Sequence, residues 1–348
     1  MKKIVFIPLI IIILFPACEN GEWDFPDNEY STVYFPYQSP VRTIVLGKDY
    51  VNDNTLDNQH KCLIMATLGG VYQNRTDVIL EVEVDDALCN NLAFANDTSK
   101  SVLPLPSNYY SLPDEMQIVI PEGKIIGGIE VSLTDAFFAD PLAISNNYVI
   151  PVVITSVTNA DSVLQGVGLV DDPNRVNSND WAVLPKDYIL YAVKYKNPYD
   201  AYYLRRGVDV VTGNSGNTAL NTTNVYHEKY VENDEVCRAM TRSLNDVSVS
   251  LKTREKDSNI DIPFEIILSF NTGGECTISN PDAVSYIVSG SGRLVEDGDI
   301  WGGIKRDVLH LQYSVDFGTS THSFTDTLVI RDRAIKFETF IPFLKEPI

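Results

Sequence analysis

Aromatic side chains in turns are the residues of this sequence best suited to ligand chemistry. A sugar-binding site typically stacks an exposed flat ring on the apolar face of a pyranose, and amide and carboxylate groups fix the hydroxyls. Trp301 lies in the Gly/Asp-rich run 297–303 between two expected strands, and loop tips often carry function. Tyr199, Tyr202 and Tyr203 follow a proline and are placed to line the same end. These four residues are the candidate ligand-binding residues; the alternatives are that Trp301 caps the core and that the tyrosines pack.

Side chains that perform catalysis or bind metals do not form a recognisable motif. The sequence contains no HExxH, GxSxG, GxGxxG or GxxxxGK pattern. Residues 297–299 and 171–180 are rich in the oxygen ligands that calcium prefers, but neither follows the calcium-loop spacing, so ordinary turns are expected. We predict no catalytic residue, no metal site and no cofactor.

The histidines are scattered along the chain: His60, His227, His310 and His322. His310 falls on the polar face of its expected strand, and His322 is placed on a neighbouring strand. Two solvated surface histidines are the expected arrangement, and a metal-binding pair is the alternative.

Four cysteines follow Cys18 in the sequence: Cys62, Cys89, Cys237 and Cys276. They form no CxxC pair, and no histidine stands at metal-ligand spacing. A chain this long does not need covalent staples, so buried free thiols are expected. The pairings Cys62–Cys89 and Cys237–Cys276 remain the alternative.

The N-terminus has the features of a bacterial lipoprotein signal peptide. Two lysines precede an apolar run at residues 4–15, and these 12 residues are too short to span a membrane as a helix. A small residue then precedes Cys18, where lipid attachment requires the thiol. We predict a signal peptide at residues 1–17 and lipidation of Cys18; the alternative is an ordinary secretory signal.

An acidic tether is predicted at residues 18–29, directly after the lipoprotein signal peptide. Its acidic residues follow Cys18 closely: Glu19, Glu22, Asp24 and Asp27. They resemble the surface-export signal of Bacteroidota lipoproteins. Stable anchoring needs more than one acyl chain, which bacterial lipoproteins carry. The sequence therefore predicts a lipid-anchored protein of the outer membrane that faces the cell exterior.

Composition limits both the partners and the fold. The 348 residues include 27 Lys+Arg and 47 Asp+Glu, a formal net charge of −20, and no basic cluster offsets it. Such a charge repels a phosphate backbone, so nucleic-acid binding is excluded. The length favours two domains. Eighteen Tyr and only four Met, with many Val, Ile and Thr, favour strands over helices.

Hydrophobic residues alternate with polar ones along most of the chain, as in antiparallel sheets with one buried face. The clearest alternating runs are 78–85, 129–133, 247–252, 264–270 and 308–317. Residues 134–143 are expected to form one helical turn. Residues 231–244 are compatible with helix or strand, and we favour strand.

A polar run divides the expected strands into two groups. Residues 171–180 contain one apolar residue, Val176, and are predicted to be an interdomain linker. The two domains are then 30–170 and 181–348. About eight short strands in the first suit an immunoglobulin-like β-sandwich. Successive short hairpins in the second suit an antiparallel up-and-down β-barrel or a second sandwich.

Several strand and turn sequences resemble one known family. The similar segments are 118–123, 148–154, 191–199, 202–207 and 326–333. They resemble two-domain Bacteroidota surface lipoproteins of unknown function, with an N-terminal domain of the DUF1735 type and a lipocalin-like C-terminal domain, often encoded near glycan-uptake systems. The strand-turn-strand beginning at Ile118 also looks like the repeat of calcium-exchanger β-domains. The resemblance covers nearly the whole mature chain and implies glycan capture, but it supplies no binding residues.

The sequence thus favours a non-enzymatic surface lipoprotein that binds glycan or assists its capture for uptake. Its expected partners are the membrane through the lipid anchor, a polysaccharide and outer-membrane uptake proteins. An adhesin or structural subunit that acts through protein–protein contacts is the alternative. A barrel that holds a small apolar ligand is a third hypothesis, which a barrel interior filled by side chains would exclude.

Overall fold

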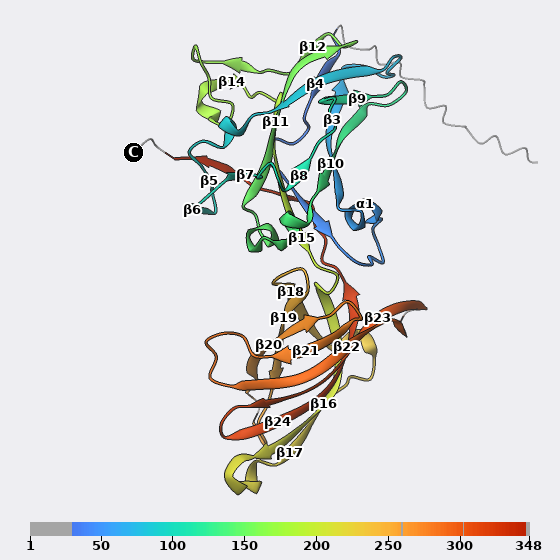
Figure 1. Ribbon diagram of the computed structural model, residues 1–348, viewed down its shortest axis with the longest axis vertical. Helices are drawn as coiled ribbons and strands as arrows, with labels where there is room; N and C mark the ends of the chain where they lie inside the picture. The colour runs from blue at the N-terminus through green and yellow to red at the C-terminus, as the bar shows by residue number, and fades with distance from the viewer. Residues whose placement is uncertain (1–29, 259, 302, 346–348) are drawn as a thin grey trace, which may run out of the picture.

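The computed structural model describes residues 30–258, 260–301 and 303–345, and Figure 1 shows two β-rich bodies stacked along the long axis. The expectation of an all-β chain is confirmed. The predicted signal peptide, Cys18 and the acidic tether at 18–29 lie outside the described residues. Within the described part, no helix is long and apolar enough to cross a membrane.

The N-terminal domain is an all-β unit built on one large hydrogen-bonded sheet of twelve strands. Its central strand order is β12-β1-β3-β10-β9-β4-β11-β15-β2-β25, with β7 beside β11 and β8 beside β10. Its strands are β1 (Thr32–Tyr34), β2 (Pro40–Val45), β3 (Lys61–Gly69), β4 (Val78–Val84), β7 (Leu103–Pro104), β8 (Tyr110–Ser111), β9 (Gln117–Ile120), β10 (Ile126–Leu133), β11 (Tyr148–Thr158), β12 (Ser162–Val163), β15 (Tyr188–Lys196) and β25 (Glu338–Thr339).

The sheet curls around a single hydrophobic core because alternate side chains on each strand point to the same side. On β3, for example, Ile64 and Leu68 are buried while Leu63 is 36% exposed. Strands from both ends of the sheet, such as β1 and β15, contribute to this cluster. Burying each such aliphatic side chain contributes about 1.5–3 kcal/mol.

Short elements cover the edges of this domain. The helical segment expected at 134–143 is confirmed by α2 (Asp135–Ala139) and a following 3-10 turn (Pro141–Ile144). The other helix, α1 (Thr55–Asn58), follows β2. Two small sheets complete the domain: β5 (Leu92–Phe94), β6 (Asp97–Ser101) and β26 (Pro342–Leu344) in one, and β13 (Val167–Gly168) and β14 (Trp181–Val183) in the other.

The C-terminal body is a closed antiparallel barrel of eight strands, so of the two predicted alternatives the barrel is confirmed. The ladder runs β16-β18-β19-β20-β21-β22-β23-β24 and closes between β24 and β16, while β17 pairs with the far half of β16. The strands are β16 (Ala201–Gly213), β17 (Thr222–Tyr226), β18 (Glu235–Thr241), β19 (Asp246–Thr253), β20 (Ile262–Phe270), β21 (Glu275–Ser279), β22 (Ile287–Trp301), β23 (Ile304–Asp316) and β24 (Ser320–Asp332). The expected strand within 231–244 is therefore present as β18.

Side chains occupy the barrel interior. Apolar residues from all eight strands form one cluster, which includes Tyr203, Phe264 and Leu309. Charged groups share the same interior, since Arg205 is 0% exposed and Asp326 is 1% exposed. An interior filled in this way argues against the hypothesis of a small apolar ligand inside the barrel.

The change from one sheet to the other lies later in the chain than the predicted linker. β15 pairs with β11 and β2, so residues up to Lys196 belong to the N-terminal sheet. Residues 171–180 instead form a surface loop between β13 and β14, and their polarity reflects turn bonds such as Asn174 N–H to Asp180 Oδ2 (2.9 Å). The C-terminal strands β25 and β26 return to the first domain.

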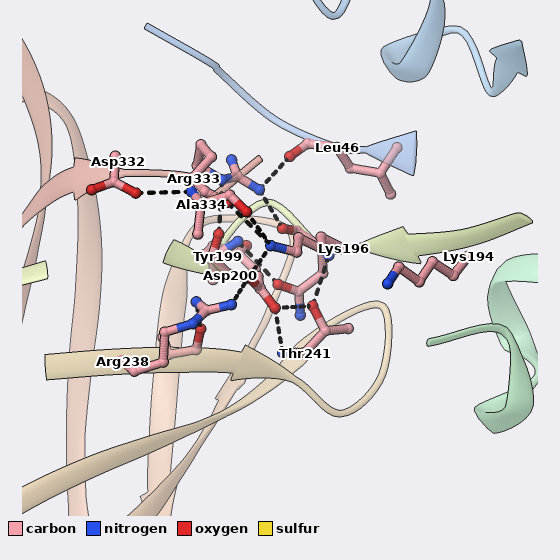
Figure 2. A network of polar contacts seen from close by, with 12 residues as sticks. Leu46, Lys194, Lys196, Tyr199, Asp200, Arg238, Thr241, Asp332, Arg333 and Ala334 are labelled. Atoms are coloured by element: carbon pink, nitrogen blue, oxygen red, sulfur yellow. Dashed lines mark hydrogen bonds and ion pairs between the residues drawn. The ribbon is translucent and has the colours of Figure 1, made fainter. Parts of the chain in front are cut away.

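Figure 2 shows the polar junction at which the two domains meet. Arg333, 3% exposed, donates to the carbonyl oxygens of Leu46 (2.9 Å) and Lys48 (3.2 Å) in the N-terminal domain. It also donates to the carbonyls of Asn197 (2.7 Å) and Asp200 (2.8 Å) in the connecting segment. One buried guanidinium therefore joins both domains and the chain between them.

The four cysteines of the described chain are free and buried, as expected: Cys62, Cys89, Cys237 and Cys276. Burial raises the pKa of each thiol to about 12. At neutral pH these thiols are protonated, inert side chains of the two cores.

Candidate functional site

The structure does not bring the four predicted aromatic residues to one surface. Tyr203 is 1% exposed and donates to the carbonyl of Tyr199 (2.9 Å), so it is a core residue. The ring of Tyr199 stacks on Phe270 with centroids 3.6 Å apart. Tyr202 is 37% exposed, but Arg238 lies over its ring at 4.9 Å.

Trp301 lies at the end of β22, near the turn to β23. Its indole N–H donates to Asp299 Oδ2 (3.0 Å), and the side chain is half-buried. Asp297, in the same run, forms an ion pair with Lys48 of the N-terminal domain (2.6 Å). This hairpin end thus contacts the other domain, away from the core positions of Tyr199 and Tyr203.

The expectation of two solvated histidines is wrong for His322. His310 is exposed, but His322 is 0% exposed and its Nδ1 lies 2.9 Å from Asp209 Oδ2. The two histidines are not a pair, because His310 lies opposite Thr327 and His322 opposite Val315. Among the described residues, no group of three or more His, Cys, Asp or Glu side chains is placed to hold a metal ion.

Ser320, His322 and Asp209 form a hydrogen-bonded chain inside the barrel. Ser320 Oγ lies 3.2 Å from His322 Nε2, and Nδ1 of the same ring faces Asp209. The order of groups is that of a nucleophile, a base and an orienting acid. Because all three side chains have no exposed surface, a substrate has no access to the serine, and the chain pairs buried polar groups with one another.

The outward face of strands β20–β24 contains a depression of about 690 Å³, lined mostly by residues with polar side chains, which we call the outer depression. The strands are in register, so residues on neighbouring strands form rows across the sheet. One row consists of Ser269, Thr277, Ser291, Gln312 and Thr325, and a second of Glu275, Arg293, His310 and Thr327.

Glycines on the inward side of β22 bring this strand close to β23. A Cβ at Gly290 would collide with the carbonyl oxygen of Gln312 and with Tyr313. A Cβ at Gly292 would meet Leu311 in the same way. Since these two inward positions need no room for a side chain, β22 sits close against β23 at the depression.

The outer depression offers hydrogen-bonding groups of several kinds. Gln312 supplies an amide, Arg293 a guanidinium and His310 an imidazole, and the serines and threonines supply hydroxyls. Glu275 receives a hydrogen bond from Asn271 Nδ2 (3.2 Å), which fixes its carboxylate at the edge. Such groups suit a hydroxyl-rich ligand, and the volume lies within the usual range of about 300–1,000 Å³ for ligand pockets.

A second pocket, of about 830 Å³, opens in the barrel wall between β17 and β19, and we call it the seam. Residues 238–241 of β18 pair with residues 247–250 of β19, whereas residues 235–237 and 251–253 of these strands are not paired with each other. Arg205 lies beneath this gap and replaces part of the missing strand pairing. Its NH1 donates to the carbonyl of Lys252 (2.9 Å) and to Glu235 Oε2 (3.2 Å). The seam therefore lies over a structural ion cluster.

The charges beneath the seam satisfy one another. Arg205 pairs with Asp326 (3.0 Å), and its guanidinium lies 3.9 Å from the ring of Tyr226. Burial raises the pKa of the Asp326 and Glu235 carboxyls, although Arg205 opposes the shift. Burial alone would lower the pKa of Arg205, but Asp326 raises it above its usual value.

Most residues of the outer depression are not predictable from the alternating pattern. The pattern places His310 on a polar strand face, but it does not single out Arg293 or Gln312. The signal that could have found them is strand register: Arg293 lies opposite His310 and Ser291 opposite Gln312 in the β22–β23 hairpin. Alternation alone does not give register.

Family models match both parts of the chain. The model described as a domain of unknown function (DUF5627) matches residues 198–334, which are the barrel strands and their junction. A model described as an N-terminal domain matches residues 26–161. No curated protein matches the chain.

Two solved structures have low similarity to this chain. An auxiliary nutrient binding protein from Bacteroides thetaiotaomicron is 15% identical, with a TM-score of 0.39 over 83% of this chain and 90% of its own. A multidomain protein including DUF1735 from Bacteroides ovatus is 12% identical, with a TM-score of 0.40 over 89% of this chain and 100% of its own.

A third solved structure is far more similar. It is a protein of unknown function from Bacteroides ovatus, 42% identical, with a TM-score of 0.83 over 92% of this chain and 100% of its own. Identity of this degree over both domains shows common descent of the whole architecture. The chain described here belongs to the same two-domain Bacteroides family of unknown function.

Proposed function

We propose that this chain is a non-enzymatic lipoprotein of the outer membrane that faces the cell exterior and binds glycan at the outer depression. The observation that carries the proposal is the depression itself. The Gln312 amide, the Arg293 guanidinium and several hydroxyls line this one solvent-facing depression, whose volume is about 690 Å³. Groups of this kind form hydrogen bonds with sugar hydroxyls.

Other features support a binding role over catalysis. The Ser320–His322–Asp209 chain is buried, and the seam overlies an ion cluster whose members bond one another. An open polar face is suited to holding a polymer at the cell surface. Outer-membrane uptake proteins are the partners that would receive the captured glycan.

The proposed localisation rests on the sequence that precedes the described residues. Residues 1–17 have the pattern of a lipoprotein signal, Cys18 is the attachment site, and residues 18–29 form the acidic tether. Because the tether leads directly to Tyr30, the N-terminal domain is the part of the chain nearest the membrane in this proposal.

Glycan binding is tested with a soluble form of the mature chain, residues 19–348. Calorimetric titration against a panel of host and dietary polysaccharides should find at least one ligand. Replacing His310 and Gln312 by alanine removes two hydrogen-bonding groups and should weaken binding about tenfold. The control is His227→Ala, an exposed histidine of the seam, which should leave the affinity unchanged.

Each other outcome contradicts part of the proposal. No binding to any glycan by the folded protein would overturn it. If only the His227 variant lost glycan binding, the binding site would be at the seam and not at the outer depression. A stable protein partner captured from solubilised outer membrane without glycan would favour the adhesin or structural-subunit alternative.

Thiol counting tests the lipid anchor. In the native mature protein the four buried thiols, whose pKa is raised to about 12, should not react with a thiol reagent at neutral pH. In denaturant the lipidated protein should show four reactive thiols, because the Cys18 sulfur is blocked. A fifth reactive thiol, with an N-terminus at Met1 by mass spectrometry, would contradict lipidation and surface location.

A further inference from the structure

We propose that the outer depression binds the interior of an extended glycan chain, which lies across the strands, and not a chain end. This inference rests on the proposed function and specifies its ligand. The five residues of the first row come from five consecutive strands, β20 to β24, and all line the depression. A ligand that follows the row therefore crosses the strands one after another.

The spacing of the row suits a repeating ligand. Neighbouring strands lie about 4.7–4.9 Å apart, so a row presents one polar side chain at each such step. This step is close to the length of one pyranose in an extended chain. Successive sugars can therefore meet equivalent groups on successive strands, for example Ser291 on β22 and Gln312 on β23.

The row is not closed at the β24 end. Thr325, its last member, lies opposite Val208 of β16, which is 38% exposed. A site for a chain end would need a wall there to stop the polymer. An open flank instead lets the chain continue over the barrel surface.

The charge of the surface also suits a neutral polymer. All five residues of the first row are uncharged, in a chain of which 21% of residues are charged. In the second row the Glu275 carboxylate is held by Asn271 (3.2 Å), while Arg293 forms no ion pair with any described residue. Its guanidinium is thus available to donate to sugar hydroxyls beside the row.

The test uses soluble residues 19–348 and oligosaccharides, from monosaccharide to hexasaccharide, cut from the polysaccharide that binds best. Affinity should rise with each added sugar until the chain spans the row, at about five strands, and then level off. Thr277→Ala and Thr325→Ala alter strands β21 and β24. Each should weaken binding of the hexasaccharide about two- to tenfold. The affinity for a disaccharide that binds at the centre of the row should stay unchanged.

Thr223→Ala in the seam is the matched control and should bind every oligosaccharide as the parent chain does. Equal affinity for monosaccharide and hexasaccharide would overturn this inference and leave the proposed function intact. If no glycan bound to the folded protein, both the proposed function and this inference would be overturned. Concentration-dependent dimerisation that Thr277→Ala and Thr325→Ala abolish would show that a second copy of the chain covers the row, and would also overturn the inference.

Discussion

Arg205 shows how one buried charge maintains the barrel where its wall is incomplete. β18 pairs with β19 only from Arg238 onward, and β19 leaves β18 after Ser250, so the carbonyl of Lys252 has no strand partner on that side. Arg205 NH1 donates to this carbonyl at 2.9 Å, and its Nε donates to Asp326 Oδ1 at 3.1 Å. A guanidinium has five donors in a fixed plane, so it can replace ladder bonds and neutralise carboxylates together.

We therefore expect Arg205→Met to lower the free energy of unfolding by about 3–5 kcal/mol, because it removes the positive charge that pairs with the buried Asp326 and the partly buried Glu235. Urea denaturation at pH 7 measures the loss. The defect should shrink at acid pH: burial raises the pKa of both carboxyls, so the folded variant binds protons more readily than the unfolded chain and gains stability as the pH falls.

Arg331→Met is the control for this prediction. Arg331 side-chain exposure is 54%, and its ion pair with Asp332 spans 3.6 Å, so its loss should change the free energy of unfolding by less than about 1 kcal/mol. If Arg205→Met were as stable as the parent chain at pH 7, the bonds beneath the seam would not support the barrel.

Such residues could not be predicted from the sequence. A charged side chain is expected at the surface, and Arg205 and His322 look like polar positions of strands with one wet face. What buries them are partners far away in the chain: Asp326 lies 121 residues from Arg205, and Asp209 lies 113 residues from His322. Only the closure of β24 onto β16 brings these groups together.

At the scale of elements, alternation predicted those strands that have regular apolar faces. The runs 264–270 and 308–317 correspond closely to β20 and β23. It gave no signal for β22, whose inward positions include Gly290 and Gly292. Because these glycines supply no apolar side chain, the longest strand of the barrel has no alternating pattern.

The close contact at Gly290 leads to a prediction for the β22–β23 hairpin. Gly290→Val should lower the free energy of unfolding by about 1–3 kcal/mol, because the new side chain collides with Gln312 and Tyr313 and forces the strands apart. The same displacement should weaken glycan binding at the outer depression. Thermal unfolding and calorimetric titration measure the two effects.

Ser289→Ala provides the comparison on the outward side of the same strand. Ser289 is exposed, so its substitution should change stability by about 0.5 kcal/mol or less. A Gly290→Val variant with unchanged stability and affinity would show that the glycine does not set the shape of the depression.

At the scale of the whole molecule, local polarity was a poor guide to the domain division. Residues 171–180 are polar because they form a surface loop, whereas the true crossing, 197–200, contains the buried side chains of Asn197 and Asp200. The return of the chain through β25 and β26 to the first domain was also unpredictable. These strands of two and three residues gain their stability from pairing with β2 and β5, not from their own sequence.

The junction at Arg333 should hold the two domains in one orientation. Its guanidinium donates to Leu46, Lys48, Asn197 and Asp200, and hydrogen bonds to a charged group are worth about 1.5–3 kcal/mol each. Burial lowers the pKa of Arg333, but Tyr203 and Asp200 oppose this shift. In Arg333→Met these carbonyls lose their donor. The radius of gyration from small-angle scattering should therefore increase as the domains move apart.

Arg331→Met, two residues earlier and exposed, is the matched control for the junction and should scatter as the parent chain does. Binding to the outer depression should survive in Arg333→Met, since the rows of β20–β24 lie wholly within the barrel. A variant with unchanged scattering would show that Arg333 does not fix the domains, and that the Lys48–Asp297 ion pair and the bond from Asp307 N–H to Tyr50 Oη suffice. Loss of glycan binding together with increased scattering would instead mean that the N-terminal domain contributes to the site.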